Sequence, residues 1–259
     1  MTPDADPNLE YVTALARGLS VLRALNDAPQ PLTLSDTAAR VGLPRAAVRR
    51  SLHTLQQTGY VQFDGRTYAP TTETLHLGAA HLNRQPFAVA AQPVLRGLSA
   101  QTGESCSVAI LSGAVITYVA RVSTSRIVSI NLQVGTQLPA SCTSMGRVLL
   151  AHLDADTLER VLSSTPLTAR TPLTITDPGV LRDELRRVRD QGYAVIDQEL
   201  ELGLRSVAVP IVAPDGRVRA ALNVGANAAS RSVTELRALV PTLQAAARRL
   251  SALDTVDRP

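Results

Sequence analysis

The chain has 259 residues, a formal net charge of +4 and a hydrophobic fraction of 45%, which favours two domains with real cores. Aromatic residues make up 3% and Trp is absent, which argues against single-strand nucleic-acid binding by base stacking. Two cysteines do not make a disulfide framework, and no apolar run approaches the ~18 residues that span a bilayer. The N-terminus has no signal-peptide pattern, so we expect a cytoplasmic protein with no membrane partner.

The N-terminal part of the chain predicts two helices after a disordered tail at 1–10. Residues 11–26 carry leucines and valines at the spacing of an amphipathic helix. Thr33 precedes Leu34-Ser35-Asp36, which resembles a capping box with Asp at the third position. Gly42 ends the second helix, predicted at 35–41, because glycine adopts the positive φ of a helix C-terminus.

A third helix is predicted at 44–58, with Pro44 in its first turn. Val48, Leu52 and Leu55 recur at helical spacing and form one apolar stripe. The side chains expected on the outward face are Arg45, Ala46, Arg49, Arg50 and His53. A helix, a tight glycine turn and a second helix with outward cations are typical of the helix-turn-helix, whose second helix enters the DNA major groove.

A hairpin is predicted directly after this helix. Strand-forming residues at 60–63 and 66–68 flank Asp64-Gly65, a strong turn pair. Such a hairpin forms a wing, with Arg66 at its tip where it would contact phosphate or the minor groove. A solvated basic face is the alternative, but the wing favours double-stranded DNA as the partner.

Residues 71–84 predict a linker helix, and residues 85–259 a second domain. His76 and His81 are five apart, whereas metal pairs on a helix prefer four, so we expect no metal and no cofactor. Helices are predicted at 87–102, 143–153, 156–163, 177–191 and 232–253. Strands are predicted at 105–111, 114–122, 126–132, 134–138, 193–197, 206–212 and 217–224. The fold class is therefore α+β, with an antiparallel sheet flanked by helices.

Polar residues at strand and helix ends suggest a small-ligand pocket in this domain. Ser144, Met145 and Gly146 open a helix, whose free backbone N–H groups suit a carboxylate, although ordinary N-capping by Thr143 or Ser144 is an equal alternative. Arg121 and Arg126 flank a turn and could hold a carboxylate bidentately, unless both are only solvated. The strand-end candidates are Asp197, Ser206, Asn223 and Gly225.

No catalytic residues are assigned. Cys106 lies in an apolar strand, where cysteine is usually an inert core residue. Cys142 precedes a helix, which would lower its pKa, and His152 is the one histidine near enough in sequence to act as its base. A thiol-dependent enzyme with a DNA-binding tail is therefore kept as an alternative, as is a module whose basic helix binds acidic protein.

The chain resembles the IclR family of bacterial transcriptional regulators over nearly its whole length. The resemblance implies a winged helix-turn-helix at 11–70, the linker helix at 71–84 and a GAF-like effector domain at 85–259. It also implies homodimers or homotetramers on palindromic promoter DNA. The matching stretches are ALARGLSVLRAL (14–25), LSDTAARVGLPRAAVRRSLHTLQQTGYV (34–61), TGESCSVAIL (102–111), LPASCTSMGRVLLA (138–151), DQGYAVIDQELELGLRSVAVP (190–210) and GRVRAALNVGAN (216–227).

The resemblance also assigns effector contacts to the helix-opening and strand-end positions above. In many relatives the residues at positions 223 and 225 are Ser, whereas here they are Asn and Gly. The ARGL start and TSMGRVLL resemble the PcaR, PcaU and PobR subgroup, which controls aromatic-acid catabolism through the β-ketoadipate pathway. Its effectors are protocatechuate, 4-hydroxybenzoate or β-ketoadipate. A regulator of another carboxylic-acid or carbon-source pathway is the alternative. A bound acid would change half-site geometry or the affinity for RNA polymerase.

Overall fold

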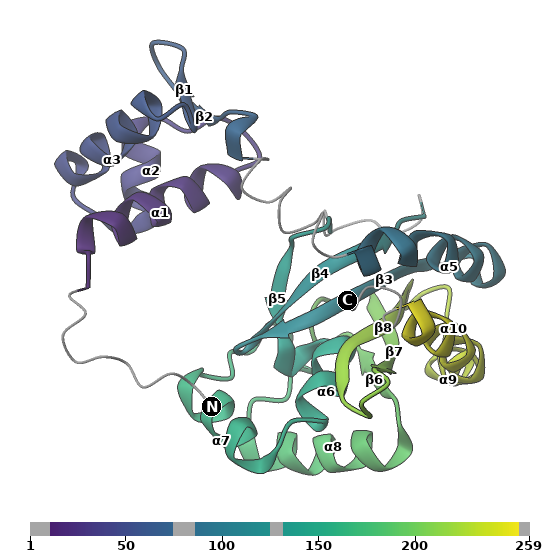
Figure 1. The fold of residues 1–259 in the computed structure, drawn as a ribbon. Coiled ribbons are helices and arrows are strands. Elements are labelled where there is room, and N and C mark those ends of the chain that lie inside the picture. Colours follow the sequence, from purple (N-terminus) through teal and green to yellow (C-terminus); the bar gives the residue numbers. More distant parts are fainter. Residues whose placement is uncertain (1–10, 75–85, 125–131, 254–259) are drawn as a thin grey trace. The chain divides into compact units, whose positions relative to one another are not determined.

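The computed structural model describes residues 11–74, 86–124 and 132–253. It divides into two compact units, Met1–Arg84 and Gln85–Pro259 (Figure 1). Within the described ranges, every helix is too short or too polar to cross a membrane. The predictions that lie wholly or largely outside these ranges are the tail at 1–10, the linker helix, the strand at 126–132, His76, His81 and Arg126.

The first unit packs three helices against a short hairpin. Val21, Leu25, Val48 and Leu52 form the centre of its core. Leu15, in the N-terminal half of the first helix, is exposed. The elements are α1 (Thr13–Asn26), α2 (Leu34–Val41), α3 (Arg45–Gln57), β1 (Val61–Phe63) and β2 (Tyr68–Pro70).

The start of α2 has the predicted capping box. The Thr33 hydroxyl accepts the Asp36 amide at 3.2 Å, and the Asp36 carboxylate accepts the Thr33 amide at 3.3 Å. Gly42 ends the helix with a φ of 66°. Pro44 is the N-cap of α3, so that helix begins at Arg45, one residue later than predicted. These ends fix the angle at which α3 leaves the tight turn.

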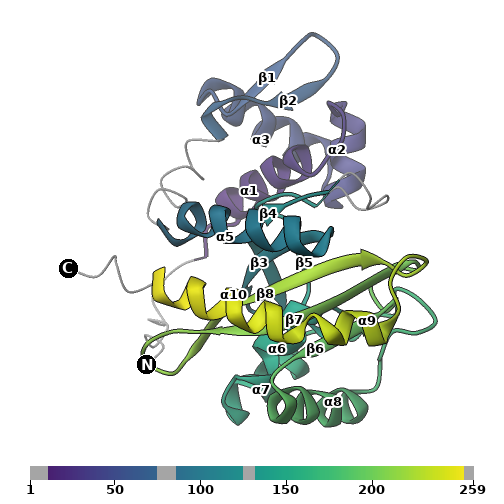
Figure 2. The same cartoon turned by 90° about the vertical axis from the view of Figure 1, so that its right-hand side faces the viewer.

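The second unit is a sheet between two helical layers. Its described strands pair antiparallel throughout, in the order β5-β4-β3-β8-β7-β6. Helices α5, α9 and α10 cover one face, and α6, with α8 packed on it, covers the other (Figure 2). This arrangement confirms the predicted α+β class. The helices are α5 (Pro86–Thr102), α6 (Ser144–Ala151), α7 (Ala155–Ser164), α8 (Pro178–Gln191), α9 (Val233–Ala238) and α10 (Val240–Leu253). The strands are β3 (Ser105–Ser112), β4 (Val115–Val122), β5 (Gln137–Pro139), β6 (Ala194–Asp197), β7 (Leu204–Val212) and β8 (Val218–Asn227), and the 3-10 turn η1 spans Ala140–Cys142.

Several boundaries in this unit differ from the prediction, and the strand predicted at 134–138 is β5 at Gln137–Pro139. The predicted helix at 232–253 is two helices, because Pro241 has no N–H to continue the ladder and α9 ends at Ala238. Strand β7 begins earlier than predicted, at Leu204, and β8 ends later, at Asn227. Ser206 therefore pairs with Gly225 inside the ladder. The extension places Ser206, Asn223 and Gly225 on one face of the sheet, whereas Asp197, which pairs with Arg205, lies on the other face.

Candidate DNA-binding surface and effector pocket

The outward side of α3 is a free cationic surface. Val48 and Leu52 are fully buried, whereas the side chains on the opposite side are exposed. Arg45 donates a hydrogen bond to the hydroxyl of Ser35 in α2. The exposed residues on this face are Arg45, Ala46, Arg49, Arg50 and His53. We call these five residues the recognition face; a face of this kind suits phosphate and base-edge contacts.

The wing has a longer turn than the predicted Asp-Gly pair. Phe63 pairs with Tyr68, and their rings stack with centroids 4.4 Å apart. The Asp64 carboxylate accepts the backbone N–H groups of Thr67 at 2.6 Å and Arg66 at 2.8 Å, which holds a four-residue turn. Mainly through the Thr67 amide, these bonds lower the pKa of Asp64 to about 2. Arg66 therefore lies in the turn at the exposed tip, not in the second strand.

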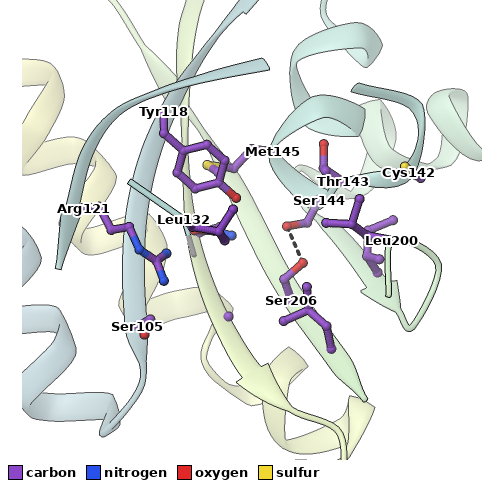
Figure 3. A pocket seen from close by; sticks show the side chains of 14 residues that line it. Ser105, Tyr118, Arg121, Leu132, Cys142, Thr143, Ser144, Met145, Leu200 and Ser206 are labelled. Carbon is purple, nitrogen blue, oxygen red and sulfur yellow. Dashed lines mark hydrogen bonds between the residues drawn. The ribbon is translucent and has the colours of Figure 1, made fainter. Parts of the chain in front are cut away.

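A pocket lies between the first turn of α6 and the sheet. It encloses about 490 Å³ of space between atoms, part of it open to solvent, and we refer to it below as the slot. Its lining residues are Ser105, Tyr118, Arg121, Leu132, Cys142, Thr143, Ser144, Met145, Ile196, Leu200, Leu204, Ser206, Asn223 and Gly225 (Figure 3).

A β-bulge in β4 builds one wall of this pocket. Tyr118 faces Ala109 across the ladder and Arg121 faces Ser107, so Val119 is an extra residue. Directly opposed residues share a face of the sheet, and Ala109 and Ser107 are two apart. Tyr118 and Arg121 therefore point to the same side, although plain alternation would separate them. Figure 3 shows both extending from β4 into the pocket.

Arg121 is the cation of the pocket. One terminal nitrogen donates to the Ser107 hydroxyl at 2.9 Å. Its Nε is buried and has no hydrogen-bond partner among the described residues. Burial lowers the pKa of this guanidinium from its ordinary value. Leaving such a donor unsatisfied costs about 1–3 kcal/mol, and a ligand anion would remove that cost.

Tyr118 is a pocket residue that the sequence reasoning missed. Its side chain is buried, and burial raises the pKa of its phenol to about 12, so the hydroxyl is a neutral donor. No hydrogen bond joins this hydroxyl to another described residue. The one clue in the sequence is an aromatic residue three positions before an arginine in a largely aliphatic strand. That spacing places the two side chains on the same face only if the strand has a bulge.

The first turn of α6 supplies the opposite wall. Thr143 is the N-cap, and its hydroxyl accepts the Gly146 amide at 3.2 Å, so the N-capping alternative holds for Thr143. The hydroxyl oxygens of Ser144 and Ser206 lie 2.8 Å apart (Figure 3). Gly146 is not a lining residue. A Cβ there would lie 2.2 Å from the Ala140 carbonyl oxygen, so its role is to let α6 pack tightly on η1.

Asp197 is not a lining residue. Ile196 and its ladder partner Ser206 line the pocket, so Asp197 and its ladder partner Arg205 face the other side of the sheet. Its carboxylate accepts a hydrogen bond from Arg205 Nε at 2.6 Å, which lowers the pKa of Asp197. Arg205 also donates to the carbonyl oxygens of Ala228 and Arg231, each at 2.9 Å. Arg205 and Asp197 therefore link the end of β6 to the segment that follows β8.

Burial opposes the ionisation of the cysteine in this pocket. Cys142 lines it, but burial raises the pKa of its thiol. Burial also raises the pKa of Cys106 to about 12. His152 is outside the lining, and its Nδ1 lies 2.7 Å from the Val148 carbonyl oxygen, which can only accept a hydrogen bond. Across the described ranges, no group of three or more His, Cys, Asp or Glu side chains gathers to hold a metal.

Comparisons with known proteins agree with this architecture. The IclR helix-turn-helix domain model matches residues 14–65, and the bacterial transcriptional regulator IclR C-terminal model matches residues 79–252. The Pca regulon regulatory protein of Pseudomonas putida is 46% identical, over 93% of this chain and 84% of that protein.

Two solved structures share the fold. A transcriptional regulator from Rhodococcus sp. RHA1 is 43% identical with a TM-score of 0.80, covering 95% of this chain and 100% of that one. An IclR homologue from Microbacterium hydrocarbonoxydans, complexed with 4-hydroxybenzoate, is 27% identical with a TM-score of 0.77, over 93% and 98% of the two chains. The expected resemblance is confirmed, and the chain belongs to the IclR family of bacterial transcriptional regulators.

Proposed function

We propose that this regulator responds to an aromatic carboxylic acid and controls genes for aromatic-acid catabolism, through the β-ketoadipate pathway from protocatechuate or 4-hydroxybenzoate. The role of transcriptional regulator follows from membership of the IclR family. The similarity to a Pca regulon regulatory protein and to a homologue that holds 4-hydroxybenzoate supports the effector class.

The observation that carries the effector class is the half-satisfied guanidinium of Arg121. A carboxylate accepts two parallel N–H bonds from one arginine, and such charge-assisted bonds are the strong ones. Arg121 lines the slot, and its buried Nε is available to an anion that enters it. An aromatic ring would pack against the apolar side chains that line the slot, which are Leu132, Met145, Ile196, Leu200 and Leu204.

The remaining polar groups would orient the ring substituents. Ser144, Ser206 and Asn223 offer hydroxyl and amide groups from three different elements. A Cβ at Gly225 would meet no atom within 4 Å, so this glycine leaves space in the slot. We assign effector contacts to Arg121, Ser144, Met145, Ser206, Asn223 and Gly225.

On the DNA side, we assign contacts to the recognition face and to Arg66. The exposed arginines of α3 would enter the major groove, and the wing tip would follow the backbone or the minor groove. A homodimer or homotetramer would match palindromic half-sites, and RNA polymerase is a partner to test. The protein would act in the cytoplasm. It would be a binding protein rather than an enzyme, because the raised pKa of Cys142 disfavours a thiolate nucleophile.

Calorimetric titration with 4-hydroxybenzoate, protocatechuate and benzoate tests the proposal. We expect wild-type protein to bind at least one hydroxybenzoate and to release it unchanged. Arg121→Gln should bind it about 10- to 150-fold more weakly, since hydrogen bonds to charged groups contribute about 1.5–3 kcal/mol. Undiminished binding by Arg121→Gln, turnover of the acid, or no binding of any acid by wild-type protein would each refute the assignment.

A further inference from the structure

A buried ion pair lies directly behind the effector pocket. Arg147, on α6 one turn after Ser144, is only 2% exposed. Its two terminal nitrogens donate to the two carboxylate oxygens of Glu199, at 2.8 Å and 2.5 Å. Its Nε donates to the Ser141 carbonyl oxygen at 2.9 Å. The guanidinium thus joins α6, η1 and the segment that carries Glu199.

Glu199 belongs to the loop between β6 and β7. That loop begins at Gln198, which has a φ of 60°, and Leu200 beside Glu199 lines the pocket. The Glu199 carboxylate also accepts the Ile175 amide at 3.2 Å, and its backbone carbonyl accepts the Thr174 hydroxyl at 2.6 Å. The residue is held on several sides, and its side chain ties the loop to α6.

A second carboxylate near Arg147 provides a contrast. Glu184, on α8, lies 3.8 Å from Arg147 and is paired mainly with Arg187. Neither Glu184 nor its neighbours line the pocket. Both glutamates are buried and both face the same arginine, but only Glu199 is next to a pocket residue.

We propose that Arg147 and Glu199 are positioning residues that form a clamp, which sets the separation of two pocket walls and thereby the affinity for the effector. The walls are the first turn of α6, with Ser144 and Met145, and the loop with Leu200. A buried ion pair is weak evidence for stability, because desolvation offsets the attraction, but its fixed bidentate geometry can specify where two elements meet. The effector class rests on the function proposed above; the clamp itself does not.

Thiol labelling tests the clamp without any effector. Cys142 lines the pocket beside the loop, whereas Cys106 belongs to the core on the other face of the sheet. In Glu199→Gln we expect a maleimide to modify Cys142 at least about 10-fold faster than in wild-type protein, with Cys106 unchanged, as peptide mass spectrometry would show. The matched control, Glu184→Gln, should leave both rates unchanged. Equal acceleration of both cysteines in a folded Glu199→Gln, or an equal effect of Glu184→Gln, would overturn the clamp.

A second variant covers the case in which Glu199→Gln does not fold. Arg147→Met with Glu199→Leu leaves no unpaired buried charge and should restore stability. We expect this double variant to melt near the wild-type temperature, yet to label faster at Cys142 alone. Wild-type protection of Cys142 in it would show that the pair only stabilises the fold.

Calorimetry with 4-hydroxybenzoate then measures the consequence for binding. Glu199→Gln, or the double variant, should bind about 10-fold or more weakly, the size expected when support behind a contact residue is lost, and Glu184→Gln should match wild type. Wild-type affinity in a clamp variant would overturn the proposal. If wild-type protein binds none of the aromatic acids, the proposed effector class fails, and the cysteine rates alone decide the clamp.

Discussion

Arginine is used in two different ways in the two units of this protein. On α3 the arginines are exposed, and Arg49 and Arg50 form no ion pair within the part of the chain that the structure describes. In the second unit Arg147 is buried and doubly bonded to Glu199, and Arg121 is half-buried, with no hydrogen-bond partner for its Nε in the described ranges. The same guanidinium group is therefore exposed on α3, ion-paired behind the pocket and incompletely bonded within it.

The difference shows what decides the role of a cation. An exposed arginine loses little hydration when it contacts a new partner. It therefore suits DNA, where many weak contacts act together and respond to salt. A buried arginine must be satisfied by a specific partner, so it suits one small anion or one fixed carboxylate. The role follows from burial and available partners, not from residue type.

The largest expected effect is on the recognition face. Replacing Arg45, Arg49 and Arg50 together by Ala should weaken binding to the protein's own upstream DNA by at least about 100-fold, since base contacts are worth ~1–3 kcal/mol each. Fluorescence anisotropy at two salt concentrations measures this loss. Removing the same charge from the second unit, by changing Arg160, Arg186 and Arg189 to Ala, should alter affinity only a few-fold. Similar losses in the two triple variants would mean that net charge, not the α3 face, binds DNA.

A smaller effect is expected from packing behind the pocket. Gly146→Ala places a Cβ 2.2 Å from the Ala140 carbonyl oxygen and should lower the free energy of unfolding of the second unit by about 2 kcal/mol. Urea unfolding measures it. Gly97→Ala in α5, where a Cβ meets nothing within 4 Å, should be neutral or stabilising by up to about 1 kcal/mol. A neutral Gly146→Ala would show that α6 is not tightly seated on η1.

The phenol of Tyr118 should contribute still less. Tyr118→Phe removes one neutral hydrogen bond, worth about 0.5–1.5 kcal/mol, and should weaken 4-hydroxybenzoate binding about 2- to 12-fold. Because burial raises the pKa of Tyr118 to about 12, that difference should stay constant from pH 6 to pH 9. Calorimetry at both pH values checks it. Equal affinities for the variant and wild type would exclude the phenol as an effector contact.

The smallest effect is expected in the wing turn. The pKa of Asp64 is lowered from 3.8 to about 2 by hydrogen bonds, so its contribution to the turn is complete above the unfolded pKa and is lost as pH falls through about 2. The amides of Arg66 and Thr67 should therefore keep their hydrogen-bonded NMR shifts at pH 4 and lose them as pH falls through about 2. Asp64→Asn should weaken the turn at neutral pH. Loss of the amide shifts already at pH 5 would contradict this account.

The recognition face was predictable from the sequence because helical period determines which side of α3 faces outward. Val48 and Leu52 fix the buried side, and Gly42 fixes the turn. The wing was predictable as a hairpin, but its turn length was not, because it depends on which backbone groups the Asp64 carboxylate accepts.

The pocket was predictable only in part. Ser144, Ser206 and Asn223 were expected, since polar residues at strand and helix ends stand out from apolar neighbours. Tyr118 was missed because a bulge changes the alternation of β4, and bulges leave no clear trace in a single sequence. The pairing of Arg147 with Glu199 joins residues 52 apart, a contact that local pattern does not reveal.

We propose that DNA and effector are read by separate arginines, Arg49 on α3 and Arg121 in the pocket. The most direct test is the affinity of Arg49→Ala and Arg121→Gln for upstream DNA, with and without 4-hydroxybenzoate. We predict that Arg49→Ala binds DNA about 5- to 150-fold more weakly, for a loss of ~1–3 kcal/mol. Arg121→Gln should bind it like wild type but not respond to the acid. Wild-type DNA binding by Arg49→Ala, or a full response to the acid by Arg121→Gln, would contradict the account.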